Sequence, residues 1–74
     1  MPLERIFGEE LRKARELKGF SQEELGFESG YHRTYISQLE RGLKSPTLKA
    51  IFSLAKALGL NPSGLLKGVE AHMK

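Results

Sequence analysis

Five polar side chains between residues 33 and 41 recur at the spacing of one helix face. On a helix, positions i, i+1, i+4, i+5 and i+8 lie together, and here they hold Arg33, Thr34, Ser37, Gln38 and Arg41. Arginine can pair bidentately with guanine and glutamine with adenine, and threonine can offer its methyl group to thymine. The acid of this segment, Glu40, falls on another face. The pattern therefore favours contact with base edges, since a solvated face without function would more often interleave Glu with Lys.

These side chains need a rigid frame, and the segment 21–42 predicts one. Ser21 can cap a short helix, and Glu24 three residues later completes a capping box. This helix should run to about Glu28, where Ser29-Gly30 breaks it. A second helix should run from about His32 to Arg41 and end at Gly42.

Two short helices joined by a glycine-containing turn have the spacing of a helix-turn-helix. The second helix of this motif can lie in the major groove of DNA. Gly26 supports this interpretation because a small residue lets the two helices cross closely. Leu25, Ile36 and Leu39 would form the buried side.

The remaining segments predict three further helices. The first should run from about Glu4 to Lys18, with Leu3, Ile6, Phe7, Leu11, Ala14 and Leu17 on its apolar face. The fourth should begin with Ser45 as the cap and Pro46 as its first residue, and its apolar stripe comprises Leu48, Ile51, Phe52, Leu54, Ala55 and Leu58. The fifth should begin at Asn61-Pro62 and fray past Lys67, because Gly64 and Gly68 each cost about 1 kcal/mol in a helix.

Length and composition restrict the class of protein. The 74 residues contain no cysteine and carry a net charge of +3. We expect a single all-α domain over residues 1–74, with no disulfide framework and no thiolate zinc site. Catalytic motifs are absent from the sequence, so we expect no enzyme and no cofactor. His72 has no second ligand near it in sequence, so we expect no metal site.

The positive charge is unevenly distributed along the chain. Residues 1–30 hold five basic and seven acidic side chains, a balance of −2. Residues 31–74 hold seven basic side chains against Glu40 and Glu70, a balance of +5. The second part is therefore expected to face a polyanion, although a solvated lysine surface would have the same composition.

Four motifs resemble those of the Cro/repressor-type (XRE-like) helix-turn-helix family, over about Phe7 to Leu66. They are Leu11-Arg12-Lys13-Ala14-Arg15, Ser21-Gln22-Glu23-Glu24-Leu25, Ile36-Ser37-Gln38-Leu39-Glu40-Arg41-Gly42 and Ser45-Pro46-Thr47-Leu48. The stretch Arg33-Thr34-Tyr35-Ile36-Ser37 also resembles controller proteins of restriction-modification systems. The resemblance implies a compact five-helix lambda-repressor-like DNA-binding domain.

The resemblance also implies roles for individual residues. Contacts to bases would come from His32, Arg33, Thr34, Ser37 and Gln38. Contacts to the DNA backbone would come from Gln22, Tyr35, Arg41, Lys44 and Ser45. Arg15 and Glu40 would form a structural salt bridge. Two alternatives stay open: His32 could serve only as a helix cap, and Tyr31 and Tyr35 could belong to the core.

We therefore expect a sequence-specific, double-stranded DNA-binding transcription regulator. One reading helix selects too few base pairs, so a homodimer would bind a palindromic operator with its helices about 34 Å apart. Residues 59–74 would form the dimer contact through Leu60, Leu65, Leu66 and Val69, or Leu65 and Leu66 would only cap the monomer core.

The expected mode of regulation follows from the short chain. It leaves no room for a ligand-sensing domain, so we expect autoregulation through protein concentration. Cytoplasmic location with the nucleoid is expected, because no secretory signal or membrane span is present. RNA polymerase would be a further partner if the protein activates transcription, and the sequence leaves activation and repression open.

Two rival functions are compatible with the same sequence. An antitoxin-type protein-interaction module would use the same fold and also bind its own promoter. A basic helical protein that binds membrane or RNA without specificity is the other, and the Arg33, Thr34 and Gln38 face argues against it.

Overall fold

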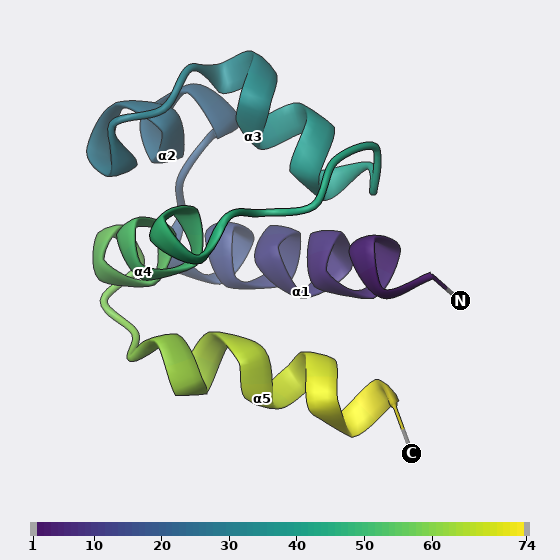
Figure 1. Ribbon diagram of the computed structural model, residues 1–74. Helices are drawn as coiled ribbons and strands as arrows, with labels where there is room; N and C mark the ends of the chain where they lie inside the picture. The colour runs from purple at the N-terminus through teal and green to yellow at the C-terminus, as the bar shows by residue number, and fades with distance from the viewer. Residues whose placement is uncertain (1, 74) are drawn as a thin grey trace.

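The computed structural model describes residues 2–73, which form five helices and no strand. The helices are α1 (Leu3–Lys18), α2 (Gln22–Ser29), α3 (Arg33–Glu40), α4 (Leu48–Ala57) and α5 (Pro62–His72). In Figure 1, α1 runs through the middle of the molecule, with α2 and α3 on one side and α5 on the other. α4 packs against both α2 and α5. The all-α, five-helix prediction is confirmed.

Local signals begin and end α2 as the sequence predicts. The Ser21 hydroxyl accepts from the Glu24 N–H at 3.0 Å, and the Glu24 carboxylate accepts from the Ser21 N–H at 2.8 Å. Gly30 ends the helix at φ 84°, a left-handed conformation that glycine adopts without steric cost. The turn that sets the angle between α2 and α3 is therefore encoded by adjacent residues.

Two helix crossings are close enough to exclude a side chain. A Cβ on Gly26 would lie 2.5 Å from the Tyr31 carbonyl oxygen, so the predicted close crossing of α2 and α3 is confirmed. A Cβ on Gly8 of α1 would collide with the Leu39 carbonyl oxygen and lie 2.6 Å from that of Glu40. The position of α3 on α1 thus depends on a glycine that the sequence analysis did not single out.

The core joins all five helices through one cluster of apolar side chains. Leu11, Leu25, Ile36, Leu39 and Leu54 are fully buried at its centre. Leu65 and Val69 of α5 belong to the same cluster, so the monomer core already buries two of the four residues assigned to a dimer contact. The other two residues of that assignment, Leu60 and Leu66, are exposed.

The predicted start of the fourth helix is wrong by two residues. Thr47 caps α4, and its hydroxyl accepts from the Ala50 N–H at 3.0 Å. Ser45 instead directs its hydroxyl to Glu4, so Pro46 stays outside the helix.

The predicted apolar faces of the first and fourth helices are too wide, because several of their large side chains are solvent-exposed. These are Leu3 and Leu17 on α1 and Leu48 and Phe52 on α4.

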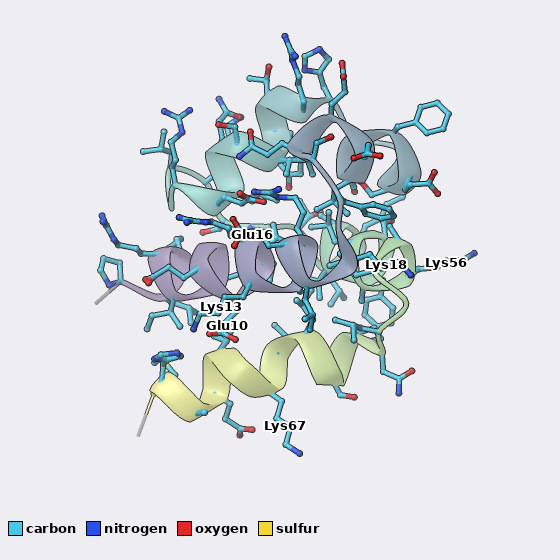
Figure 2. All side chains as sticks on the ribbon, turned by 180° about the vertical axis from the view of Figure 1, so that it is seen from behind. Glu10, Lys13, Glu16, Lys18, Lys56 and Lys67 are labelled. Atoms are coloured by element: carbon cyan, nitrogen blue, oxygen red, sulfur yellow. The ribbon has the colours of Figure 1, made fainter. Side chains whose placement is uncertain are left out.

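The expected fraying of the fifth helix past Lys67 is also wrong, because α5 continues to His72. Packing of Leu65 and Val69 in the core offsets the weak helix propensity of the two glycines. Figure 2 shows Glu10 and Lys13 on the side of α1 that faces α5. Glu10 lies where a Cβ on Gly68 would be, and its carboxylate lies 3.2 Å from His72 Nε2. Gly68 thus leaves room for the Glu10 carboxylate between α1 and α5.

Candidate nucleic-acid interface

The outer face of α3 presents the side chains that the sequence assigned to base contacts. On the inner face of α3, the side chains of Ile36 and Leu39 are fully buried. His32, Arg33 and Thr34 are exposed at the N-terminal end of the helix, and Ser37 and Gln38 are half-buried along it. The structure therefore leaves all five residues at least partly accessible, three at the N-terminal end of α3 and two along it.

His32 is the N-cap of α3. Its Nδ1 accepts from the Thr34 N–H at 3.0 Å, so the neutral ring carries its proton on Nε2. His32 is thus a helix cap, as the first alternative requires. The exposed Nε2–H remains able to donate to an acceptor outside the protein.

A network of charged and amide groups holds the C-terminal end of α3 against α1. Arg15 Nε donates to Glu40 Oε2 at 2.6 Å, and Arg15 Nη2 donates to Glu40 Oε1 at 3.0 Å. The Arg15 and Glu40 side chains are only 12% and 3% exposed. The hydrogen bond to Glu40 raises the pKa of the Arg15 guanidinium, and partial burial opposes this effect. This is the salt bridge expected from the sequence.

The same network fixes α2 beside α3. Gln22 Nε2 donates to Glu40 Oε1 at 3.1 Å, and Arg15 Nη1 donates to the Phe20 carbonyl oxygen at 2.8 Å. Gln22 is the first residue of α2, where free backbone N–H groups favour an anion. The network thus places the positive end of α2 next to the C-terminal end of α3.

Some aromatic and loop residues around α3 make contacts within the protein, and others are exposed and can contact a partner. Tyr35 packs on Tyr31 with 4.9 Å between ring centroids, and both rings lie against the core. Arg41 and Lys44 are exposed in and beside the turn after α3. The Ser45 hydroxyl donates to Glu4 Oε2 at 2.9 Å, so its proton is engaged within the protein.

Glu4 connects the start of α1 to this loop. The pKa of its carboxyl lies below the ordinary value because its own backbone N–H and the Ser45 hydroxyl donate to it. A negative charge therefore lies beside Ser45. Lys44 and Arg41 are the better placed of the three loop residues for an anion.

The distribution of charge in space differs from its distribution along the chain. Figure 2 shows Lys67 projecting from α5 away from α2 and α3, and Lys56 projecting sideways from α4. Lys74, also part of the basic share, lies outside the described residues. Of the basic residues in the second part of the chain, Arg33, Arg41 and Lys44 lie on α3 or in the loop after it, so only part of the +5 balance can face one anion.

One acidic residue near this face was missed by the sequence analysis. Glu23 Oε2 lies 3.9 Å from Arg33 Nη1, across the turn between α2 and α3. The capping box already placed Glu23 in the first turn of α2, and this was the one sign in the sequence that it lies near the predicted DNA-facing side. Its proximity to Arg33 depended on the angle between the two helices.

Other kinds of site find no support in residues 2–73. No group of three or more His, Asp or Glu side chains is placed to hold a metal ion within that range. Over the same residues, no helix has the length and hydropathy needed to cross a bilayer. The exposed polar side chains of α3 and the cations after it are suited to contact a nucleic acid, in which base edges lie beside a chain of phosphates.

Comparison with known proteins identifies the motif. A family described as Helix-turn-helix matches residues 11–65, which include the network and all of α3. The chain belongs to this helix-turn-helix family. Within it, the control protein C.BamHI of Bacillus amyloliquefaciens is 47% identical over 62 residues, covering 82% of this chain and 76% of the relative.

Two further members of the helix-turn-helix family extend the comparison. The control protein C.SmaI of Serratia marcescens is 41% identical over 66 residues, covering 89% of this chain and 79% of its own. The crystal structure of the restriction-modification controller protein C.AhdI from Aeromonas hydrophila superposes with a TM-score of 0.82 at 44% identity. That match covers 84% of this chain and 94% of C.AhdI. The fold is therefore the one these controllers share.

Proposed function

We propose that this protein is a transcription regulator that binds double-stranded DNA sequence-specifically and inserts α3 into the major groove. The observation that carries the proposal is the exposed arginine, threonine and histidine at the N-terminal end of α3, a helix whose C-terminal end is held by the Arg15–Glu40–Gln22 network. Polar groups on a rigid helix can discriminate base edges, whereas flexible ones discriminate poorly. Membership of the helix-turn-helix family supports the same function rather than an enzymatic one.

The regulator acts as a homodimer on a palindromic operator. The support is an apolar surface on and near α4 that the monomer leaves exposed, with Phe52 57% exposed. Phe52, Leu60 and Pro62 line a shallow depression between α4 and α5. Leu48 and Leu66 extend the apolar area, which is the kind of surface that a second copy covers.

The pathway is control of a restriction-modification system, with the protein acting on its own promoter from the nucleoid. This part rests on the relatives, which are named as control proteins and as a restriction-modification controller. For activation, RNA polymerase would contact the outer face of α2, where Phe27 is 84% exposed beside Glu24 and Glu28. A gel shift with the DNA upstream of the protein's own gene tests autoregulation.

Selection of bound sites from random duplex DNA tests the main proposal. We expect a palindromic consensus whose half-sites are about one helical turn apart. Recovery of unrelated sequences after repeated selection would contradict sequence-specific binding. A consensus without symmetry would contradict the dimer but not the DNA-binding role.

Arg33→Ala should weaken binding to the selected site by about 1–3 kcal/mol and relax specificity at one base pair. The reason is that an arginine at this exposed position can donate two hydrogen bonds to guanine. Titrations with the selected site and with its single-base variants measure the effect. An equal loss on random DNA would show that Arg33 contacts only phosphate.

Lys44→Ala should weaken binding to all duplexes and reduce the salt slope of log Kd by about one unit. Lys44 is exposed in the loop after α3, where it can neutralise one phosphate. Lys67→Ala is the matched control, because Lys67 points away from α2 and α3. Equal slopes for the two variants would remove Lys44 from the interface.

Phe52→Ala should weaken dimerisation about 30-fold, or about 2 kcal/mol, as expected for an aromatic anchor at an interface. Sedimentation equilibrium measures the dimer constant. Phe27→Ala removes an equally large exposed ring from α2 and should leave that constant unchanged. If both variants dimerise like the unmodified protein, the interface lies elsewhere.

A further inference from the structure

Within residues 2–73, the acidic side chain paired with a predicted base-reading residue is Glu23. Its Oε2 lies 3.9 Å from Arg33 Nη1, and the two side chains are 77% and 65% exposed. They come from different helices, so the short turn between α2 and α3 brings them together. Neither side chain is needed for the core, because both point to solvent.

The position of Glu23 is unusual for a surface that binds a polyanion. It lies in the first turn of α2, next to Gln22, where free backbone N–H groups attract a phosphate. A carboxylate there stabilises α2 through the helix dipole. It also repels a phosphate that approaches either the end of α2 or the Arg33 guanidinium.

We propose that Glu23 is a specificity-determining residue that holds Arg33 in place for a guanine and opposes its use on unspecific phosphates. The inference rests on the proposed function and adds to it a residue that itself contacts no base. Glu23 is a positioning residue for Arg33.

The hydrogen-bonding capacity of arginine explains why Glu23 favours contact of Arg33 with guanine over contact with phosphate. A guanidinium has five N–H groups, and a guanine edge accepts from two of them. Glu23 can therefore keep its contact with Nη1 while Arg33 pairs with a base in the groove. When no guanine is present, Arg33 would turn to the nearest phosphate. That step separates Arg33 from Glu23. The Glu23 carboxylate then has no partner and repels the phosphate that Arg33 has bound.

The test compares Glu23→Gln with Glu28→Gln. Both changes remove one negative charge from an exposed position on α2, and no ion pair of Glu28 occurs within residues 2–73. Glu28→Gln therefore reports the effect of net charge alone. Kd is measured for the selected site and for a scrambled duplex of equal length over a range of salt concentrations.

We expect Glu23→Gln to strengthen binding to the scrambled duplex about two- to five-fold more than Glu28→Gln does, as suits an exposed ion pair. Binding to the selected site should not gain by this factor, so the ratio of the two affinities falls. In an Arg33→Ala background, the difference between Glu23→Gln and Glu28→Gln should shrink to the direct repulsion between Glu23 and a phosphate at the end of α2. Thermal unfolding confirms that both variants are folded at the assay temperature.

Two outcomes separate this inference from the proposed function. If the unmodified protein keeps its consensus but Glu23→Gln behaves like Glu28→Gln, Glu23 acts only through net charge and the inference is overturned. If the unmodified protein prefers no sequence, the proposed function fails and the specificity role fails with it.

Discussion

Glu40→Ala is expected to destabilise the folded protein by about 3–5 kcal/mol, because it leaves the Arg15 guanidinium without its carboxylate. Glu40 is buried and Arg15 is partly buried, and two hydrogen bonds of 2.6 and 3.0 Å join them. Removing one partner of such a pair leaves an uncompensated charge in a poorly solvated place. Gln22 Nε2 would also lose its acceptor.

The size of the domain makes this loss severe. A 74-residue protein has a total stability of about 4–11 kcal/mol at the usual value per residue. Urea unfolding followed by circular dichroism should show a much lower midpoint for Glu40→Ala. DNA binding should fall in parallel, since the same network holds α3 and the first residue of α2.

Two control variants define the reason for the loss. Glu16→Ala breaks the exposed pair with Arg12 and should cost less than about 1 kcal/mol. The double variant Arg15→Met, Glu40→Leu should be more stable than Glu40→Ala alone, because no buried charge is left unpaired. If the double variant proves less stable than the single one, an unpaired Arg15 charge is not the cause of the loss.

The parts of this fold that could be predicted are those with local causes. Ser21 and Glu24 lie three residues apart and satisfy each other's backbone groups, so their capping box is visible in the sequence. Gly30 ends α2 because it is a glycine after a helical stretch. The face of α3 follows from helical periodicity, and its inner residues Ile36 and Leu39 are fully buried.

The parts that could not be predicted depend on contacts between distant segments. Ser45 and Thr47 are equally good helix caps by type, and a hydrogen bond to Glu4, 41 residues away, takes Ser45 out of that role. Leu65 and Leu66 are identical residues, but only Leu65 points to the core. The approach of Glu23 to Arg33 depends in the same way on the angle between two helices.

Gly8→Ala is expected to destabilise the protein by about 3 kcal/mol, although alanine is the better helix former. Alanine inside a helix normally gains up to about 1 kcal/mol over glycine. At Gly8 its Cβ would collide with the Leu39 carbonyl oxygen and lie 2.6 Å from that of Glu40. These are backbone atoms of α3, so the collision is relieved only by moving that helix away from α1.

The position of Gly8 adds a functional consequence to the loss of stability. Glu40 is at the C-terminal end of α3, so moving this helix lengthens the hydrogen bonds that Glu40 makes with Arg15. DNA affinity measured on the folded fraction, at low temperature, should therefore fall together with the unfolding midpoint.

Gly64→Ala is the matched control for this prediction. Gly64 lies in the first turn of α5, and a Cβ there meets no atom within 4 Å. This variant should gain about 0.5 kcal/mol by restricting the unfolded chain. Opposite signs for the same substitution at two helical glycines would show that packing outweighs propensity at Gly8. A gain at both positions would mean that α1 and α3 can separate without cost, and would contradict the role of Gly8 in setting their distance.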